Sequence, residues 1–430
     1  MKARFIITLS AAAICVACSP GTKVPQDSTV QTTAPAAQEK PLVSDSPASF
    51  VVFGDHGYHL EWPSKSDLRD KPQSAEEWYE LRLHPGQYAA GLQQPERLPA
   101  IELSPVTGGY VLSTGLYRVS DAMHKACASS ACRFGVMLGD NVYPDGGDGL
   151  DDTRRFEEIL VKPLTRLAHE KEDFRIYSVL GNHDWHTSRE GAQAQMEFLE
   201  STPPFYMDDY FYRVVPPGLE GEVEIFAIDT EVMLAGTDVH KLKKTDGFWE
   251  IDEDSLMTPR KSAVPRTKAE RTMVEWLESA LAGSQARWKI VIGHHPFWST
   301  AGGKFAQSVA LRNLILPALC QHADAYLSGH EHTMELHQYD CSGLGPDMPE
   351  EPFYQVVSGA AGKQRMTNLP FMQKQDELDD SLQTLFARGG TWGYAMATLD
   401  GDELKFDLYT IGMDGIPHEA FSHTIMNRAE

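Results

Sequence analysis

Five short motifs in this chain of 430 residues place polar side chains directly after apolar runs. Each motif has a glycine before its first polar group, in the stretches FGDHG, LGDNVY, LGNHD, IGHHP and SGHEH. Among their side chains, the candidate site residues are carboxylates, imidazoles, a phenol and an amide: Asp55, Asp140, Tyr143, Asn182, His183, Asp184, His294, His295, His330 and His332. Groups of these kinds bind metal ions in proteins. The motifs therefore predict a metal site, provided that the fold brings them together.

The apolar runs ahead of the motifs predict strands at residues 49–53, 134–138, 175–180, 224–228, 288–292 and 325–327. Amphipathic stretches predict helices at 113–126, 152–168, 188–199, 268–282 and 309–321, and Pro317 is expected to kink or end the last one. This alternation indicates an α/β core. Because ligands of α/β sheets lie beyond the carboxyl ends of the strands, side chains from all five motifs can meet in one crevice.

Four later apolar runs, at 333–338, 353–357, 394–399 and 404–409, have no long helices between them. We expect them to form a second, mostly antiparallel sheet. Polar segments near 60–107, 234–265 and 363–390 are punctuated by proline and glycine. We interpret these three segments as insertions in a domain that spans residues 49–430.

Any one of the five motifs is weak evidence. A single Gly-Asp is usually a turn, and a single Gly-His is more often a hydrogen-bonded loop histidine. Five such motifs at five predicted strand ends are hard to attribute to chance. The inference of a metal site depends on the set.

The ordered set GDxG, GDxxY, GNHD, VxxH and GHxH resembles that of the purple acid phosphatases, within the calcineurin-like metallophosphoesterases. The resemblance covers about residues 53–362, includes the words GHHPFWS and YLSGHEH, and is nearest to the single-domain, tartrate-resistant branch. It implies a four-layer αββα sandwich, in which two mixed sheets are flanked by helices, with a dinuclear metal centre. The segment between Asp55 and Asp140 is longer than in that branch, so details of the substrate pocket do not carry over.

The same resemblance implies a division of labour among the ligands. Asp55, Tyr143 and His332 would hold the first metal, and Asp140 would bridge the two. Asn182, His294 and His330 would hold the second.

Tyr143 bears on the identity of the first metal. Most relatives in the wider superfamily have a histidine two residues after the first aspartate, where this chain has Gly57. A phenol, with an unperturbed pKa near ~10, binds well only as phenolate, which favours Fe³⁺ over zinc. The second metal would be divalent, as Fe²⁺, Zn²⁺ or Mn²⁺, and the ferric–divalent pair would keep a positive charge that attracts phosphate. The alternative is that Tyr143 packs over the core as a strand-end aromatic residue.

The resemblance implies a hydrolase, an acid phosphatase-like enzyme that cleaves phosphate monoesters with a metal-activated hydroxide. His183 would stabilise charge or protonate the leaving oxygen, and Asp184 could orient it. His295 could touch the substrate. The alternatives are that His183 only supports the site and that His295 packs in the core with Pro296 and Phe297. His56 and His59 are expected at the surface or behind the ligands.

Two other functions remain open at this point. The same centre could serve a phosphodiesterase or a nucleotidase. A non-catalytic envelope lipoprotein could instead retain the fold to bind phosphate or metal. Such a protein is expected to lack a ligand, and all seven are present.

The N-terminus predicts export. Lys2 and Arg4 precede an apolar run at 5–17, and Cys18 follows in CVACSP, which resembles the processing box of bacterial lipoproteins. We expect a signal peptide at 1–17, a lipid on Cys18 that attaches the protein to a membrane, and a flexible tether at 18–48. The protein would be an outer-membrane lipoprotein facing the periplasm or the cell surface. The alternative is an ordinary signal peptide that releases a soluble periplasmic protein.

Charge and cysteine usage fit an exported enzyme with a small substrate. The net charge of −23 disfavours nucleic acid, and a phosphate site must create its own positive field. Four cysteines remain beyond Cys18, which suggests two disulfides in an exported chain. Pairing of neighbours, Cys127–Cys132 and Cys320–Cys341, is preferred, and the other two connectivities stay open.

Overall fold

A computed structural model describes residues 47–69, 101–169, 171–245, 248–302, 304–346 and 348–428. These residues lie in one compact unit of the chain, residues 42–430. The predicted signal peptide, the tether up to residue 46 and residues 70–100 of the first predicted insertion fall outside the described residues. Among the described helices, none combines the length and the apolar character that a membrane span needs.

The first large sheet has seven strands in the order β19-β18-β17-β1-β5-β6-β7. Its parallel part consists of β1 (Ala48–Phe53), β5 (Phe134–Leu138), β6 (Ile176–Val179) and β7 (Phe205–Tyr206). Antiparallel strands extend it on the other side of β1: β17 (Trp392–Asp400), β18 (Glu403–Ile411) and β19 (Pro417–Met426). Strands from both ends of the chain are therefore neighbours.

The second large sheet also has seven strands, in the order β16-β14-β15-β13-β12-β9-β8. Its parallel part consists of β9 (Val223–Ala227), β12 (Trp288–Ile292), β13 (Ala325–Ser328) and β15 (Phe353–Ser358). The antiparallel strands are β8 (Tyr212–Val214), β14 (Met334–Tyr339) and β16 (Leu382–Arg388). Both sheets thus combine a parallel centre with antiparallel additions.

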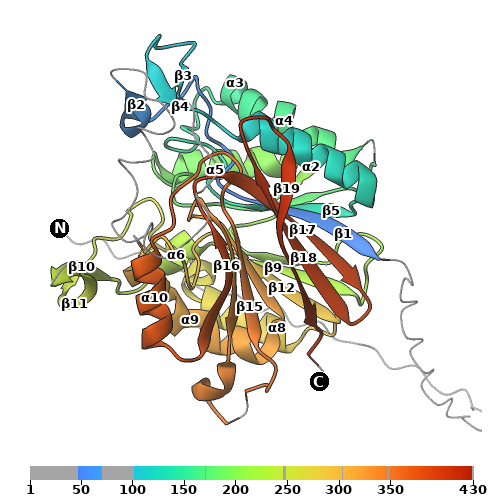
Figure 1. The fold of residues 1–430 in the computed structure, drawn as a ribbon, viewed down its shortest axis with the longest axis vertical. Helices are drawn as coiled ribbons and strands as arrows, with labels where there is room; N and C mark the ends of the chain where they lie inside the picture. The colour runs from blue at the N-terminus through green and yellow to red at the C-terminus, as the bar shows by residue number, and fades with distance from the viewer. Residues whose placement is uncertain are drawn as a thin grey trace, which may run out of the picture. The chain divides into compact units, whose positions relative to one another are not determined.

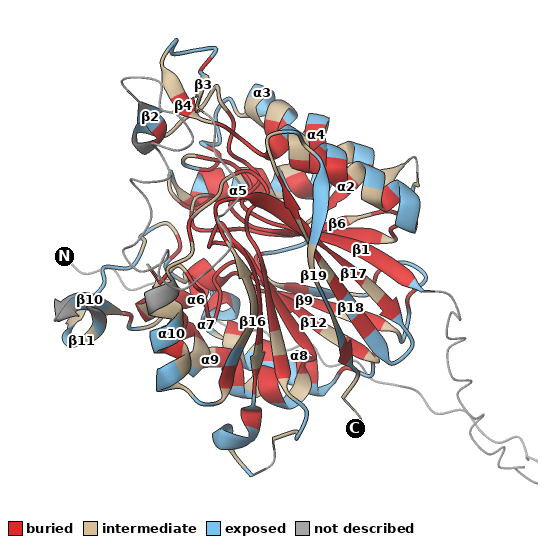
Figure 2. Cartoon of the chain, in the orientation of Figure 1, coloured by how far each residue is buried: buried red, intermediate tan, exposed pale blue. Residues whose placement is uncertain are grey.

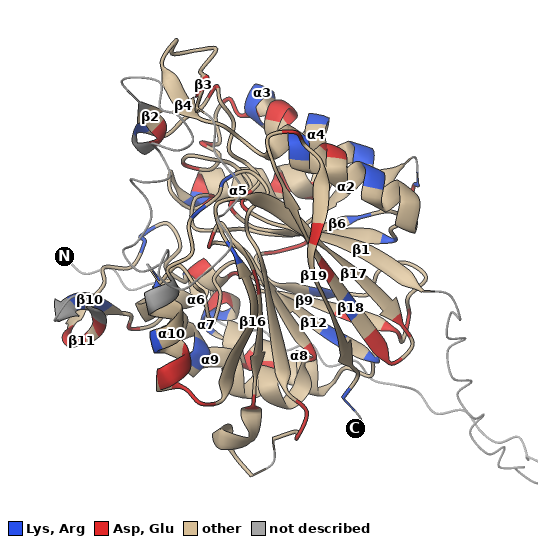
Figure 3. Ribbon diagram, in the orientation of Figure 1, with Lys and Arg blue, Asp and Glu red and all other residues tan. Residues whose placement is uncertain are grey.

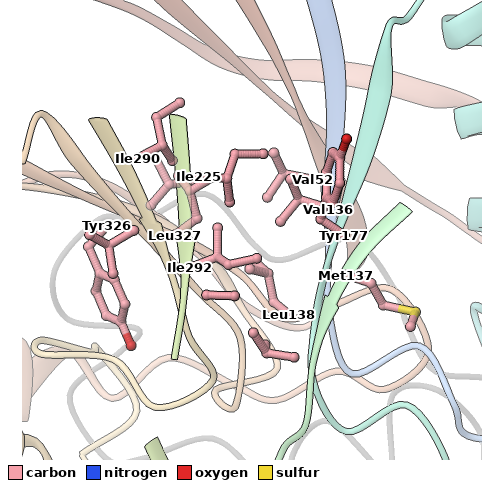
Figure 4. Packing of buried hydrophobic residues seen from close by; sticks show 14 of the residues in the cluster. Val52, Val136, Met137, Leu138, Tyr177, Ile225, Ile290, Ile292, Tyr326 and Leu327 are labelled. Carbon is pink, nitrogen blue, oxygen red and sulfur yellow. The ribbon is translucent and has the colours of Figure 1, made fainter. Parts of the chain in front are cut away.

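The two sheets pack face to face over an apolar core. Val52, Val136 and Leu138 of the first sheet meet Ile225, Ile292 and Leu327 of the second, and all six side chains are fully buried (Figure 4). In Figure 2 the central strands of both sheets are buried along most of their length, whereas the edge strand β19 is largely exposed and the outer helices each show an exposed face. Charged residues are frequent on those outer helices, whereas the central strands of both sheets carry few (Figure 3).

Helices cover the outer faces of the sandwich (Figure 1). Those over the first sheet include α2 (Leu116–Ser130) and the short α3 (Thr153–Phe156) and α4 (Lys162–Leu164); those over the second include α8 (Met273–Ala282) and α9 (Phe305–His322). Parallel strands need a covered face on each side, since their crossover helices return over the sheet. The expected αββα sandwich is confirmed.

The expectation of a separate antiparallel sheet was wrong. The later strands divide between the two sheets: β14 and β15 belong to the sheet that contains β13, and β17 and β18 belong to the sheet that contains β1. The apolar pattern identifies a strand but does not specify its partner, because partner choice depends on long-range packing. Pro317 does not end α9, which continues to His322.

The predicted insertions differ in how they meet the core. Segment 234–265 forms a two-stranded ribbon of β10 (His240–Thr245) and β11 (Phe248–Leu256), paired with each other only. The described parts of segment 60–107 contribute β2 (Leu68–Arg69) and β3 (Ile101–Leu103) to a small sheet with β4 (Tyr110–Leu112). Segment 363–390 holds α10 (Leu369–Leu378) and β16. Because β16 is an edge strand of the second sheet, this segment is not simply an insertion.

Two disulfides have the preferred connectivity. Cys127 pairs with Cys132 at a Cα–Cα distance of 4.7 Å, and Cys320 pairs with Cys341 at 5.9 Å. Both distances lie in the usual range for a disulfide. The first closes the end of α2, and the second ties α9 to the segment that follows β14.

Candidate metal centre

The carboxyl ends of five parallel strands meet at one place between the two sheets. Asp55 follows β1, Asp140 follows β5 and Asn182 follows β6 of the first sheet, whereas His294 follows β12 and His330 follows β13 of the second. With Tyr143 and His332 they form a group that we call the ligand cage. The structure thus brings together all seven residues expected to bind metal.

One half of the ligand cage centres on the Tyr143 hydroxyl. This oxygen lies 3.0 Å from Asp55 Oδ1, 2.8 Å from Asp140 Oδ2 and 3.1 Å from His332 Nε2. Asp55, Asp140 and His332 each offer a ligand atom within 4.8 Å of the others. This is the set that the resemblance assigns to the first metal.

The other half centres on His294 Nε2. It lies 3.3 Å from Asp140 Oδ1, 3.2 Å from Asn182 Oδ1 and 3.0 Å from His330 Nδ1. His294 Nδ1 contacts the Leu138 carbonyl at 2.8 Å, which leaves Nε2 to face the site. Asp140 directs one oxygen to each half, as a bridging ligand would.

Three of the cage residues have left-handed backbones. The φ angles are +55° at Asp55, +51° at Asp140 and +68° at His330. Such conformations cost about 1–3 kcal/mol each in residues other than glycine, and they persist where the surroundings enforce them. The backbone thus stores strain at three of the positions where the ligands converge.

The buried acids of the ligand cage shift one another's pKa values. Burial, together with the Asp140 charge, raises the pKa of Asp55 well above its ordinary value. Burial opposes it, yet His294 and His183 hold the pKa of Asp140 below its usual range. Burial and the two carboxylates raise the pKa of the Tyr143 phenol. A bound cation would offset this repulsion and favour the charged forms of the two carboxylates and the phenol.

The donors in the ligand cage fit a pair of metal ions. Burial lowers the pKa of His330 and His332 well below the ordinary value, so both imidazoles are neutral, as ligands must be. His330 Nε2 is buried and has no hydrogen-bond partner in the described structure. Oxygen and imidazole donors suit iron, zinc or manganese.

His183 is the most exposed of the ten residues from the five motifs, with 27% of its side chain accessible. Its Nδ1 contacts the Pro144 carbonyl, which accepts a hydrogen bond from the ring and fixes it. Its Nε2 lies 4.0 Å from Asp140 Oδ2, and the ring packs on Tyr143 at 4.3 Å between centroids. His183 therefore marks the accessible side of the site.

Asp184 does not orient His183, contrary to expectation. Its carboxylate is fully buried and accepts hydrogen bonds from the main chain of Gly181, Asn141 and Val142 and from the side chain of Gln195, at 2.8–3.1 Å. These bonds join the loops after β5 and β6. Asp184 thus fixes the backbone that carries Asp140 and Asn182, and Pro144 orients His183.

His295 is buried next to the ligand residue His330. The residue is 1% exposed, its Nδ1 lies 2.8 Å from Thr230 Oγ1 and its Nε2 lies 3.4 Å from Glu231 Oε2. Its ring packs against His330 at 4.4 Å. The alternative of a packed histidine is the one that the described contacts favour. His56, expected at the surface or behind the ligands, is also buried, and burial lowers its pKa to about 3.

Close packing of the backbone explains why position 57 holds glycine and not histidine. A Cβ atom on Gly57 would lie 2.1 Å from the Asn141 carbonyl oxygen. The same contact places the Gly57 carbonyl where it accepts a hydrogen bond from the Tyr143 main chain, at 3.1 Å. The loop after β1 thus packs directly on the loop that presents Tyr143, and a side chain at position 57 would separate them.

Sequence reasoning missed two cations beside the ligand cage. Arg365 pairs with Glu331, and Lys363 Nζ lies 3.1 Å from Asp67 Oδ1 and 4.9 Å from the centre of the Tyr143 ring. Glu331 raises the pKa of the Arg365 guanidinium. Glu331 lies between two ligands in SGHEH and could have been noticed there; Lys363 and Arg365 have no recognisable motif.

Comparisons with known proteins agree with this arrangement. The sequence profile of the family described as calcineurin-like phosphoesterase matches residues 114–334. Purple acid phosphatase 4 of Arabidopsis thaliana is 29% identical over 229 residues, which cover 51% of this chain and 59% of that protein. Tartrate-resistant acid phosphatase type 5 of Homo sapiens is 28% identical over 215 residues, 49% of this chain and 58% of that protein. The chain thus spans less than two thirds of these relatives.

Solved structures share the fold at low identity. A purple acid phosphatase from yellow lupin, Lupinus luteus, superposes with a TM-score of 0.51 at 13% identity, covering 89% of this chain and 54% of that one. GAP50 of Plasmodium, titled the anchor in the inner membrane complex, has a TM-score of 0.52 at 15% identity, covering 89% and 90%. At these identities the likeness concerns the fold alone.

Proposed function

We propose that this chain, which belongs to the calcineurin-like phosphoesterase family, hydrolyses phosphate monoesters. It resembles proteins that are named purple acid phosphatases. The observation that carries the proposal is the position of Asp140 between two sets of ligands, Asp55 and His332 on one side and His294 and His330 on the other. A bridging carboxylate of this kind is what a two-metal hydrolytic site requires.

We assign Fe³⁺ to the half of the ligand cage that contains Tyr143 and a divalent ion, Fe²⁺, Zn²⁺ or Mn²⁺, to the half that contains Asn182. The assignment rests on the Tyr143 hydroxyl, which touches both carboxylates, and on the absence of a side chain at Gly57. When bound, the metal pair would supply a hydroxide nucleophile and a Lewis acid for phosphate oxygens.

The protein's own contribution to the reaction centres on His183. Its Nδ1 proton is committed to the Pro144 carbonyl, so Nε2 is the atom that can carry a proton to the leaving oxygen. Asp184 keeps the flanking loops in place through its buried hydrogen bonds. The His183 ring packs on Tyr143 at 4.3 Å between ring centroids, which supports a role for His183 as proton donor beside the proposed first metal.

Hydrolysis of 4-nitrophenyl phosphate and of bis(4-nitrophenyl) phosphate, with and without chelator, tests the proposal. We expect chelator-sensitive cleavage of the monoester, and cleavage of the diester alone would favour the phosphodiesterase alternative. An iron-loaded protein should be violet through phenolate-to-iron charge transfer, and Tyr143→Phe should abolish the colour. A colourless zinc protein with full activity would overturn the ferric assignment but keep the phosphoesterase.

We also propose, from the sequence before residue 19 alone, that the protein is exported and lipidated on Cys18. Metabolic labelling with a radioactive fatty acid should mark the wild type and not Cys18→Ser. Labelling of neither protein would favour the soluble periplasmic alternative.

A further inference from the structure

We infer that Arg365, positioned by Glu331 and supported by Lys363, binds a second, singly charged anionic group on the substrate's leaving portion. The inference deepens the proposed function and rests on it. It assigns a substrate class: phosphate monoesters whose alcohol carries a carboxylate or a similar anion. Arg365 and Lys363 are the residues that would determine this specificity.

The segment that carries both cations is bonded directly to the ligand cage. The main-chain N–H of Gly362 donates to the Asp55 carbonyl at 3.1 Å, and that of Arg365 donates to the His332 carbonyl at 2.8 Å. Asp55 and His332 belong to the same half of the cage. A segment bonded to both holds Lys363 and Arg365 at a fixed position beside the first metal position.

Arg365 has one side engaged and one side open. Its NH1 donates to Glu331 Oε2, and Glu331 is completely buried between the two ligands His330 and His332. The Arg365 side chain is 38% exposed, and in the described residues its other nitrogens have no hydrogen-bond partner. A guanidinium can bind a carboxylate through a second edge while the first edge stays paired. Glu331 therefore positions Arg365 without saturating it.

Lys363 adds positive charge on the accessible side of the site. Its ammonium lies over the Tyr143 ring at 4.9 Å and over the Tyr58 ring at 4.7 Å, and Asp67 holds it at 3.1 and 3.2 Å. The Lys363 side chain is 15% exposed. The Tyr143 ring also packs on His183, so Lys363 and the proposed proton donor lie against the same aromatic residue.

The charges favour a singly charged group. The chain as a whole carries −23, so two cations beside the ligand cage are a local exception. Asp67 and Glu331 each offset part of the positive charge. The residual field suits a carboxylate, whereas the dianionic phosphoryl group would bind the metal pair. A leaving group without charge would leave the open edge of Arg365 to water.

A matched pair of non-hydrolysable ligands tests the inference without requiring turnover. The probes are 3-phosphonopropionate, with a carboxylate, and propylphosphonate, without one, titrated calorimetrically into the full metal-loaded chain. We expect the wild type to bind 3-phosphonopropionate about 10-fold or more tightly than propylphosphonate, as one charge-assisted hydrogen-bonded pair would give. In Arg365→Met the ratio of the two affinities should fall toward one, and in Lys363→Met it should fall partway.

Removal of Arg365 alone would leave Glu331 buried without its partner, which could unfold the protein. The double variant Arg365→Met/Glu331→Gln removes both charges and should show the same loss of preference. Lys405→Met and Arg287→Met remove cations that pair with acids far from the site, and they should keep the wild-type ratio. Equal affinities of the wild type for both probes, or an unchanged ratio in the double variant, would overturn the inference.

Failure of the inference is distinguishable from failure of the proposed function. If the metal-loaded wild type cleaves 4-nitrophenyl phosphate but shows no preference between the two phosphonates, the substrate class is wrong and the phosphatase stands. If it cleaves no phosphate ester yet prefers 3-phosphonopropionate, Arg365 binds anions at a site that is not hydrolytic.

Discussion

The ligand cage and the pair of cations beside it differ in how the chain builds them. Every cage residue directly follows a strand or lies within a few residues of one. Asp184 holds the loops after β5 and β6 through its hydrogen bonds to their main chain. Lys363 and Arg365 come from a segment after β15 and depend on two salt bridges, one of them to Asp67 in a different segment. The comparison suggests that the cage sets the reaction and the cations set its substrate.

The largest effect is expected at the residue that both halves of the cage share. Asp140→Asn removes a charge from each half, and we expect the loss of bound metal and a fall in kcat/KM on the order of 10³-fold or more for every phosphate ester. Metal analysis and steady-state kinetics measure both quantities. An Asp140→Asn variant that keeps two metals and near-normal activity would contradict the bridging role of Asp140 and the view that the ligand cage determines the reaction.

His183→Ala should have a smaller effect of a different kind. Because His183 is adjacent to the ligands without being one of them, metal content should stay unchanged while kcat falls by about 10²-fold, the loss typical of a missing general acid. The deficit should shrink for leaving groups that need no protonation, such as 4-nitrophenol. His322→Ala, at a histidine far from the site near the end of α9, serves as the control. Loss of metal in His183→Ala would instead make it a supporting residue.

Asp324, a buried acid outside the ligand cage, should make the stability of the fold depend on pH. Burial raises the pKa of Asp324 from 3.8 to about 6, and its Oδ2 accepts a hydrogen bond from the Lys289 main chain at 2.7 Å. Between these two pH values the folded protein keeps a proton that the unfolded chain releases. The free energy of unfolding should therefore fall as pH rises through this window, by at most roughly 3 kcal/mol from this group.

Asp324→Asn should remove that part of the slope, whether or not metal is bound. Urea unfolding at several pH values between about 4 and 6 measures it. Asp402→Asn, at an exposed carboxylate, should keep the wild-type slope. An unchanged slope in Asp324→Asn would show that other groups produce the pH dependence, among them Asp229, whose pKa burial raises to about 7.

The residues that sequence reasoning placed well are those whose position follows from a strand. An apolar run fixes where β12 ends, and the end of a parallel strand fixes where His294 lies. The next residue, His295, has the same chemistry and the same neighbours in sequence, but its ring turns to Thr230 and Glu231. Adjacent side chains at a strand end point in different directions, and the motif does not reveal which of two histidines faces the metal.

Pairing between distant segments could not be predicted. The strand β17 was expected in a separate sheet and instead pairs with β1, because the sequence pattern contains no signal for partner choice. The same holds for Arg365. Its position depends on a main-chain hydrogen bond to His332 and a salt bridge to Glu331, which join the segment after β15 to the loop after the neighbouring strand β13.

The smallest effect is expected at the contact between the loop that carries Asp55 and the loop that carries Tyr143. Gly57→Ala places a Cβ atom against the Asn141 carbonyl, where the loop after β1 meets the loop that presents Tyr143. The collision involves backbone on both sides, so neither can move without displacing a ligand. We expect a loss of about 1–3 kcal/mol in unfolding free energy together with weaker metal binding. Gly343→Ala, where an added Cβ meets only a side-chain oxygen at 4.0 Å, should change neither by a measurable amount. If Gly57→Ala lost stability but kept full metal affinity, the ligand cage would tolerate movement of Tyr143. The inference that close packing at Gly57 is needed to hold Tyr143 as a metal ligand would then be wrong.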